Sequence, residues 1–226
     1  MFDCFLFDFD GTLVHSERAY LYSFQHSIKL HTGIEVSEAE FKRFWHMNMS
    51  PEDVLSNFGE EMLEEMVVSF EEFYYANHHH HVELFDGIAE LLDELQQRDI
   101  RFGLVSLKPR RAGVIEVDNL GLSRIIATRI WGDDVENIKP APDGALHALN
   151  QLNAAPQNTL VIGDSAADIL MGRAAGTYTA AALWGNPHTF HREKLLATKP
   201  DFVIDSPMQI VECLKSGVWS RLLHNE

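Results

Sequence analysis

The chain of 226 residues is poor in cysteine, in basic side chains and in long apolar runs. Its two cysteines, Cys4 and Cys213, stand at opposite ends without paired metal-ligand spacing, which favours free thiols over a disulfide framework or a zinc site. No apolar run reaches the roughly 20 residues that cross a bilayer. Asp3, Asp8 and Asp10 occupy the place of the basic region of a signal peptide. We therefore expect a cytoplasmic protein without a membrane partner.

The shortage of basic residues also limits the ligands. Lysine and arginine number 18 against 34 aspartates and glutamates, so the formal net charge is −16. A field of this sign repels polyanions at long range, and we expect no nucleic-acid partner. A small phosphorylated ligand would be repelled too, so a phosphate site in this chain needs a bound cation and well-placed basic side chains.

Short apolar runs alternate with helix-like stretches along most of the chain. Helices are expected at 109–120, 142–152 and 166–175, the last closed by Gly176 as a C-terminal cap. This alternation predicts an α/β fold with a doubly wound, Rossmann-like parallel sheet that is covered on both faces. The expected strands are 4–9, 101–106, 125–130, 159–163 and 178–183.

Residues 16–80 interrupt this alternation, because they carry several helix patterns and no strand. Helix-capping signals begin at Ser37 and Ser50. We therefore expect an all-helical cap domain at 16–81, inserted into a catalytic core of 1–15 and 82–226. An insertion that leaves the end of the first strand would cover the usual ligand site of such sheets and exclude water from it.

Four consecutive histidines, His78, His79, His80 and His81, stand where the insertion returns to the core. We expect a solvated hinge loop there, because an isolated histidine tract is a signal of composition only. The sequence gives the tract no further role.

Acidic residues stand at the ends of two expected strands. Asp8 and Asp10 alone fit a simple turn. Asp164 and Asp168 follow another strand, however, and four carboxylates at neighbouring strand ends could not all stay ionised without a cation. Mg²⁺ fits such oxygen ligands, and we expect Asp8, Asp10 and Asp164 to bind it. Asp168, one helical turn further, is expected to orient bound water, to pair with a lysine or to be a weak ligand.

Two further residues suit a phosphate group. Lys139, followed by Pro140, supplies the positive charge that an acidic chain requires. Ser106 ends an expected strand and offers a hydroxyl and nearby backbone N–H groups to a phosphate oxygen. Each residue alone is equally typical of an ordinary surface position.

Together these segments resemble the four motifs of the haloacid dehalogenase superfamily, in order: DFDGT at 8–12, Val105-Ser106, Lys139-Pro140 and GDSAAD at 163–168. The resemblance is to members with a helical cap after the first motif, which include phosphoglycolate phosphatases, pyrophosphatases, nucleotidases and β-phosphoglucomutases. Segments 182–185 and 199–207 look like the phosphoglycolate phosphatase-like branch.

The chain departs from the pattern of that branch at three positions. Ser106 stands where threonine is commoner, and a leucine precedes Lys108-Pro109 where the branch often has asparagine. His15 occupies a common aspartate position. None of these departures touches the expected metal-binding acids.

The resemblance implies a hydrolase mechanism on a small phosphorylated metabolite. Asp8 would attack phosphorus and form an aspartyl-phosphate, and Asp10 would protonate the leaving oxygen and later activate water. Mg²⁺, Lys139 and Ser106 would stabilise the developing charge. Because dehalogenases need no proton donor at the position of Asp10, this residue favours a phosphatase.

Several alternatives stay open. The same site could serve a phosphomutase of the β-phosphoglucomutase type or a catalytically silent binding or regulatory protein on the same fold. Phosphoglycolate leads the candidate substrates, with nucleoside monophosphates, sugar phosphates and pyrophosphate open, and monomer and homodimer are both compatible with the sequence. The candidates for substrate contact in or beside the cap are His15, Lys42 and Arg43, together with His46 and Asn48.

Overall fold

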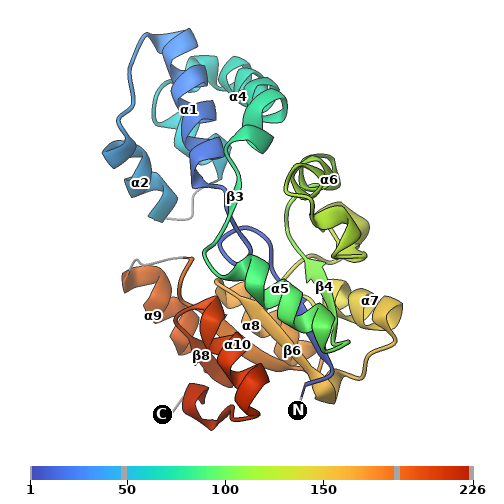
Figure 1. Cartoon of the computed structure of the whole chain (residues 1–226). Coiled ribbons are helices and arrows are strands. Elements are labelled where there is room, and N and C mark those ends of the chain that lie inside the picture. Colours follow the sequence, from blue (N-terminus) through green and yellow to red (C-terminus); the bar gives the residue numbers. More distant parts are fainter. Residues whose placement is uncertain (1, 47–49, 186–188, 224–226) are drawn as a thin grey trace. The chain divides into compact units, whose positions relative to one another are not determined.

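The computed structural model describes residues 2–46, 50–185 and 189–223, with the side chains of 45–46 and 189–191 left outside that description. The chain forms two compact units (Figure 1). The core unit comprises Met1–His15 and Leu84–Glu226, and the helical unit comprises Ser16–Glu83. Asn48 lies outside the described residues, and so does the side chain of His46.

The core unit contains a six-stranded parallel sheet in the order β5-β4-β1-β6-β7-β8. This order places β1 between β4 and β6, so the connections run outward from β1 in both directions, and the predicted doubly wound α/β fold is confirmed. The strands are β1 Cys4–Phe7, β4 Arg101–Val105, β5 Thr128–Ile130, β6 Thr159–Gly163, β7 Tyr178–Ala182 and β8 Phe202–Ile204.

Two details of the sheet differ from the expectation. The strand predicted at 125–130 begins only at Thr128, because Leu122–Arg124 form a 3-10 turn. In that turn the carbonyl oxygen of Leu122 accepts the N–H groups of Ile125 and Ile126, which keeps both residues out of the ladder. The strand β8 was not predicted as an element.

Helices cover both faces of the sheet (Figure 1). On one face, α7 packs on β4 and β5, and α8 packs on β6 and β7; on the other, α5 packs against α10. Alternation along β1 directs Cys4 and Leu6 into the α7–α8 side of the core and Phe5 and Phe7 toward the opposite face. The helices are α5 Ile88–Gln97, α6 Arg110–Asn119, α7 Asp143–Leu152, α8 Ala166–Ala174, α9 Thr189–Ala197 and α10 Pro207–Ser216.

The helical unit is built on the packing of α1 against α4. Both predicted capping signals are present: Ser37 Oγ accepts the Glu40 N–H at 3.2 Å, and Ser50 Oγ accepts the Asp53 N–H at 3.1 Å. None of the helices in the described part of the chain is long and apolar enough to span a membrane. The helices are α1 Glu17–Thr32, α2 Glu38–His46, α3 Pro51–Ser56 and α4 Leu63–Asn77.

Short elements complete the chain. The two-residue strands β2, Val14–His15, and β3, Glu83–Leu84, pair where the chain passes between the units. The 3-10 turns are η1 Glu60–Met62, η2 His78–His80, η3 Leu122–Arg124, η4 Gly132–Asp134, η5 Pro156–Asn158 and η6 Ser220–Leu222.

The histidine tract corrects the sequence prediction. His78 is only 1% exposed, and its ring stacks on Tyr74 with centroids 4.8 Å apart and an angle of 11° between the planes. The helical backbone of α4 continues into η2, which places residues four apart on one face and brings the two rings together. The prediction of a solvated loop was therefore wrong for His78.

Candidate active site

The loop that follows β1 carries Asp8 and Asp10. The Asp8 N–H donates to the carbonyl oxygen of Ile162 in β6 at 2.9 Å, which fixes the start of the loop against the neighbouring strand. Gly11 then adopts a φ of 78°, and a Cβ atom at that position would lie 2.3 Å from Asp164 Oδ2. Glycine is required because only a bare backbone allows this conformation and so close an approach of the carboxylate.

Three carboxylates meet at this edge of the sheet. Oxygen atoms of Asp8, Asp164 and Asp168 all lie within 4.8 Å of one another, and we call these residues the acidic cluster. Asp164 comes from the end of β6 and Asp168 from the first turn of α8. Because β1 and β6 are neighbours, residues 156 positions apart converge at one point, as expected for strand ends in a parallel sheet.

Lys139 supplies the positive charge inside this cluster. Its Nζ atom lies 2.6 Å from Asp8 Oδ1 and 2.5 Å from Asp168 Oδ1. The lysine side chain is 3% exposed, so the bonds form away from bulk water and are less screened than on a surface. The predicted pairing of Asp168 with a lysine is present in the structure.

Burial and mutual repulsion perturb the cluster. Burial raises the pKa of Asp8 to about 7, with Asp168 and Asp10 adding to the rise and Lys139 opposing it. Burial and the charges of Asp8 and Asp168 hold the pKa of Asp164 well above its ordinary value. Burial alone would lower the pKa of Lys139, but the attraction of Asp168 and Asp8 outweighs it and raises that pKa.

This surplus of negative charge fits a hard divalent cation. Three carboxylates face one lysine, and a cation would let all of them ionise. Asp168 is already engaged, since Oδ1 binds Lys139 and Oδ2 accepts the Ser165 N–H at 3.1 Å and the Ser165 hydroxyl at 2.5 Å. Asp8 and Asp164 are therefore the members of the cluster best suited to bind the ion directly.

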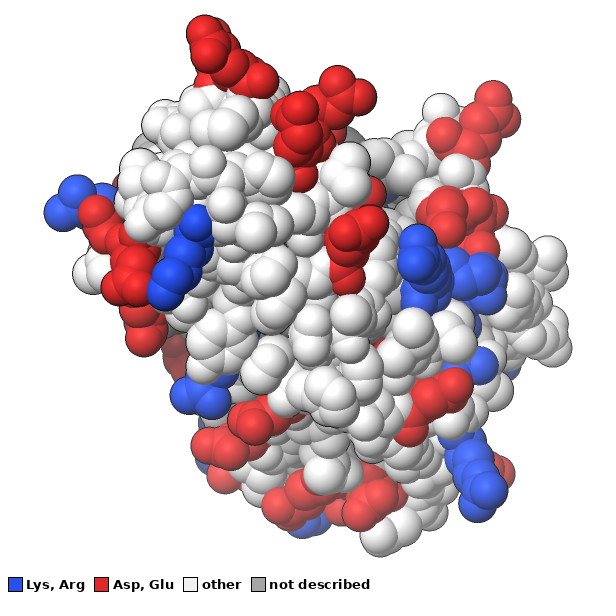
Figure 2. Space-filling model, turned by 90° about the horizontal axis from the view of Figure 1, so that it is seen from above, with Lys and Arg blue, Asp and Glu red and all other residues white. Residues whose placement is uncertain are grey.

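The surface supplies little of the required positive charge. In Figure 2, acidic side chains are widespread over the visible face, and basic ones are dispersed among them. Attraction of a phosphate must then come from the site itself, where Lys139 and a bound cation act at short range.

Asp10 does not join the acidic cluster. Its Oδ1 atom lies 2.8 Å from Lys108 Nζ, in the loop that follows β4. Ser106 starts that loop: its N–H donates to the carbonyl oxygen of Ile130 at 2.9 Å, and its Oγ accepts the Lys108 N–H at 3.1 Å. Because β4 lies next to β1, Ser106 and Lys108 stand at the same edge of the sheet as the acids.

The site therefore combines clustered carboxylates, a buried lysine and a strand-end serine. Comparison with known protein families shows which family carries these residues. The sequence pattern of the haloacid dehalogenase-like hydrolases matches residues 5–182, which include all of these side chains. The chain belongs to this family.

Relatives within the haloacid dehalogenase-like hydrolases cover nearly the whole chain. A protein named Pyrophosphatase PpaX from Bacillus cereus is 31% identical over 211 residues, covering 93% of this chain and 95% of its own. A crystal structure assigned as a phosphoglycolate phosphatase from Lactobacillus plantarum is 27% identical, with a TM-score of 0.74 and coverage of 94% and 99%. The predicted resemblance is thereby confirmed, and the chain is a hydrolase of the phosphatase type.

A third relative bears on the fold alone. A crystal structure assigned as a β-phosphoglucomutase from Thermotoga maritima has a TM-score of 0.81, covers 96% of this chain and 100% of its own, and is 22% identical. At that identity the likeness shows a shared core and helical insertion, without bearing on the reaction.

Three site residues of this haloacid dehalogenase-like chain escaped prediction from the sequence. Lys108 was noted only as a departure, and its buried partner Glu116, on α6, was not considered. Trp184 was quoted only as part of a resembling segment, yet its Nε1 donates to the carbonyl oxygen of Thr12 at 2.9 Å. The segment after β7 therefore packs on the loop that carries Asp8 and Asp10. Lys108, beside motif residues and followed by proline, gave the only usable signal.

The remaining candidates lie outside the acidic cluster. The His15 ring packs on Phe85, with centroids 3.5 Å apart. Lys42, on α2 of the helical unit, pairs with Glu38 at 2.6 Å, and Arg43 beside it is exposed. Their part in substrate contact stays a prediction.

Proposed function

We propose that the chain is a magnesium-dependent phosphatase that hydrolyses a small phosphate monoester through an aspartyl-phosphate on Asp8. The observation that carries this proposal is the buried lysine that joins Asp8 to Asp168. A lysine at 2.6 Å from a carboxylate at the open end of a sheet can bind a phosphate oxygen while it holds the attacking group in place.

The first chemical step falls to Asp8 and Asp10. A carboxylate oxygen of Asp8 attacks phosphorus, the bond between phosphorus and the leaving oxygen breaks, and Asp10 gives that oxygen a proton. Lys139 and the Ser106 hydroxyl stabilise the negative charge on the phosphoryl oxygens. The products of this step are an aspartyl-phosphate and the leaving group, which is an alcohol for an ester and inorganic phosphate for pyrophosphate.

The second step reverses the role of Asp10. Its carboxylate takes a proton from water as the water oxygen attacks phosphorus, and the bond between phosphorus and Asp8 breaks. Inorganic phosphate leaves, and Asp8 is again a carboxylate. One residue serves as acid and then as base, so its position matters in both steps.

Asp8 and Asp164 would hold Mg²⁺, and Asp168 would orient their surroundings; the carboxylate of Asp10, the third ligand predicted from the sequence, lies against Lys108. The ion would supply charge neutralisation for the phosphoryl oxygens and for the carboxylates themselves. The raised pKa values of Asp8 and Asp164 support a cation here, because burial and, after it, the charges of neighbouring acids oppose ionisation of both carboxyl groups.

The helical unit is proposed to act as the cap. A mobile cap over the strand ends would exclude water during the first step and supply the contacts that select the ester. His15, at the passage between the units, and Lys42 and Arg43, on α2, are the proposed contacts for the substrate.

Two substrates stand first among small phosphorylated metabolites. Similarity to the protein named Pyrophosphatase PpaX supports pyrophosphate as a candidate substrate of this chain. Similarity to the crystal structure assigned as a phosphoglycolate phosphatase supports 2-phosphoglycolate. Both are small dianionic or more highly charged compounds, as the local cation and Lys139 require.

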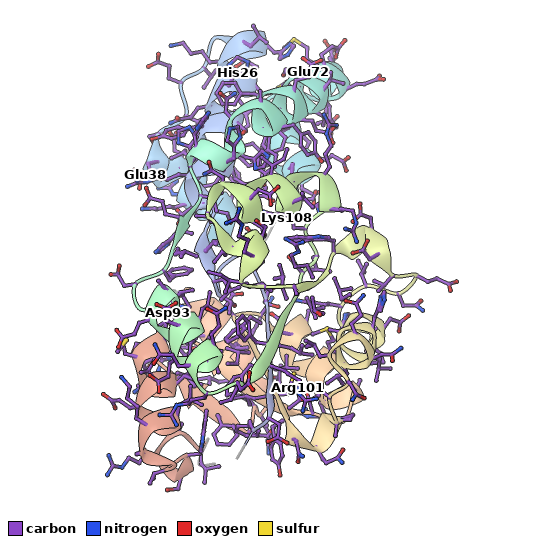
Figure 3. The ribbon with its side chains drawn as sticks, turned by 45° about the vertical axis from the view of Figure 1, so that its right-hand side comes forward. His26, Glu38, Glu72, Asp93, Arg101 and Lys108 are labelled. Carbon is purple, nitrogen blue, oxygen red and sulfur yellow. The ribbon has the colours of Figure 1, made fainter. Side chains whose placement is uncertain are left out.

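Phosphate release from 2-phosphoglycolate, pyrophosphate, hexose phosphates and p-nitrophenyl phosphate, with Mg²⁺ and with a chelator, tests the proposal. We expect Asp8→Asn to abolish turnover while the circular-dichroism spectrum stays unchanged. Asp93→Asn is the matched control, since Asp93 is an exposed residue of α5 (Figure 3). Turnover that persists in Asp8→Asn, or that is unchanged by the chelator, would contradict the mechanism.

The same panel separates the rival functions. A phosphomutase would convert one hexose phosphate into an isomer with little release of phosphate. A silent binding protein would release none from any ester, although it could still bind Mg²⁺.

A further inference from the structure

A second buried lysine lies beside Asp10. Lys108 Nζ is 2.8 Å from Asp10 Oδ1 and 2.6 Å from Glu116 Oε2. The side chains of Lys108 and Glu116 are 1% and 0% exposed. Burying charges away from water is costly, so a buried ion pair that ends on a candidate catalytic acid calls for a functional explanation.

The backbone under Lys108 is held on both sides. Its N–H donates to Ser106 Oγ at 3.1 Å, and its carbonyl oxygen accepts the Gly132 N–H at 3.1 Å. A Cβ atom at Gly132 would lie 2.5 Å from the carbonyl oxygen of Leu107, so the two loops are in close contact. The lysine therefore extends from a fixed turn.

The side chain of Lys108 is held as well. Its ammonium lies 5.4 Å from the centre of the Phe9 ring, within the range of a cation–π contact. Phe9 packs edge-on against Trp131, with centroids 5.8 Å apart at 89°. Both rings are buried, so they restrict the ammonium to the region between Asp10 and Glu116.

Glu116 fixes the far side of the ammonium. It is one of the buried residues of α6, the helix that begins two residues after Lys108. A hydrogen bond of 2.6 Å from Lys108 Nζ to Glu116 Oε2 ties the loop to the helix. Lys108 thus joins Glu116, which is buried on α6, to Asp10 in the candidate active site.

The contact between Lys108 and Asp10 is an ion pair at a buried carboxylate oxygen. The Oδ1 atom of Asp10 is buried and makes no hydrogen bond of acceptable geometry with the described residues, whereas Lys108 faces it as an ion-pair partner. Asp8 and Asp168, by contrast, each bind Lys139 with hydrogen-bond geometry.

We infer that Lys108, anchored by Glu116, is a positioning residue that holds the Asp10 carboxylate in the orientation needed for proton transfer to and from the substrate oxygen. The inference rests on the proposed phosphatase function. Restraining Oδ1 leaves the other oxygen to exchange the proton, and a small misplacement of such a group lowers the rate strongly.

A purely structural explanation competes with this inference. Lys108 could serve only to neutralise Glu116 inside the core. Removing both charges at once separates the two explanations, because the double variant Lys108→Met/Glu116→Gln removes the buried charge of Glu116 together with that of Lys108 and changes only the ion-pair partner of Asp10. It should keep the fold in either case and lose the positioning of Asp10 only if the inference is right.

Two esters of similar size report on the proton. Phenyl phosphate has a poor leaving group that needs a proton, and p-nitrophenyl phosphate has a good one that leaves without help. Because kcat/KM covers the steps up to cleavage of the ester, it isolates the first proton transfer. The test is to determine kcat/KM for both esters, with Mg²⁺, in wild type, both single variants and the double variant.

We expect the double variant to lose about 100-fold in kcat/KM on phenyl phosphate and about threefold or less on p-nitrophenyl phosphate. Its thermal midpoint should return close to that of wild type, whereas Lys108→Met alone should melt earlier. Lys29→Met is the matched control, since its ion pair with Glu35 is exposed and belongs to the helical unit, whereas Lys108 and Asp10 belong to the core unit.

Each other outcome overturns the inference. Equal losses on both esters would show that Lys108 does not act through the proton of Asp10, and full activity in the double variant would leave it a structural residue. A wild type that cleaves neither aryl ester and releases no phosphate from any compound of the panel above overturns the proposed function, and the inference with it, which distinguishes the two failures.

Discussion

Two buried lysines flank the loop that carries Asp8 and Asp10, and they differ in the charge around them. Lys139 bridges two members of an acidic cluster that contains a third carboxylate. Lys108 bridges Asp10 and Glu116. The acidic cluster around Lys139 therefore has a surplus of negative charge that a cation would balance. Lys108 instead joins Asp10 to the buried Glu116. In the roles proposed above, Lys139 balances negative charge and Lys108 positions the Asp10 carboxylate.

The largest expected effect comes from removing the lysine of the acidic cluster. Lys139→Met leaves Asp8 and Asp168 without their counter-charge and takes away the cation that would meet a phosphoryl oxygen. We expect kcat to fall about 1,000-fold on p-nitrophenyl phosphate. The measurement is steady-state phosphate release with saturating Mg²⁺.

The comparison lysine provides the control for that prediction. Lys108→Met/Glu116→Gln should lose little on the same ester, because its good leaving group needs no proton. A loss of less than tenfold in Lys139→Met, or losses of equal size in the two lysine variants, would remove the difference in role.

In the double variant Lys108→Met/Glu116→Gln, stability should recover, whereas activity on phenyl phosphate should not. Lys108→Met removes the ion pair of a fully buried Glu116, and we expect a loss of about 3–5 kcal/mol in the free energy of unfolding. Adding Glu116→Gln should recover most of it. Urea unfolding by circular dichroism measures both variants, and a double variant as unstable as the single one would contradict the ion-pair account.

The acidic cluster makes its own prediction about pH. The pKa of Asp8 is raised from 3.8 to about 7 in the folded chain, chiefly by burial. Between those values the unfolded chain has released the proton and the folded chain still holds it, so stability falls as pH rises from 4 to 7. For the metal-free protein we expect a loss of up to about 4 kcal/mol over that range.

Mg²⁺ should remove most of this pH dependence, because a bound cation favours the ionised carboxylates. Chemical denaturation at several pH values, with and without the ion, gives the answer. Asp164→Asn is the informative variant, since it should weaken both the pH dependence and the effect of Mg²⁺. A metal-free protein equally stable at pH 4 and pH 7 would contradict the raised pKa of Asp8.

The two lysines also differ in how far the sequence could predict them. Lys139, Asp8 and Asp164 follow from local motifs at strand ends, and the topology of a parallel sheet brings strand ends together without further information. The pairing of Lys108 with Glu116 depends on which face α6 buries. That helix mixes polar and small residues, RRAGVIEVDN, so its pattern does not mark Glu116 as a buried position.

Asp10 and His78 show the same limit. The sequence places Asp10 beside Asp8 as a metal ligand, but the direction of its carboxylate toward Lys108 depends on the packing of a neighbouring loop. The burial of His78 depends on the continuation of α4 through η2, which a run of four histidines does not reveal. The fold and the positions of the acids at strand ends could be predicted because they follow from local pattern. Contacts that depend on which face of a helix is buried or on how a neighbouring loop packs could not.

The smallest effect is expected at an exposed lysine, which sharpens the contrast with the two buried ones. Lys42 pairs with Glu38 four residues earlier on α2, and both side chains are largely open to water. Ion pairs of this kind contribute little to stability, so we expect the thermal midpoint of Lys42→Met to match that of wild type within error.

The KM for the preferred ester decides whether Lys42 has any further role. If its only partner is Glu38, KM should change less than about twofold, because a screened surface charge adds little to binding. Glu38→Gln is the paired control, since it frees Lys42 without removing the ammonium. A KM that rises severalfold in Lys42→Met and stays constant in Glu38→Gln would instead make Lys42 a substrate contact, in the role proposed for the cap.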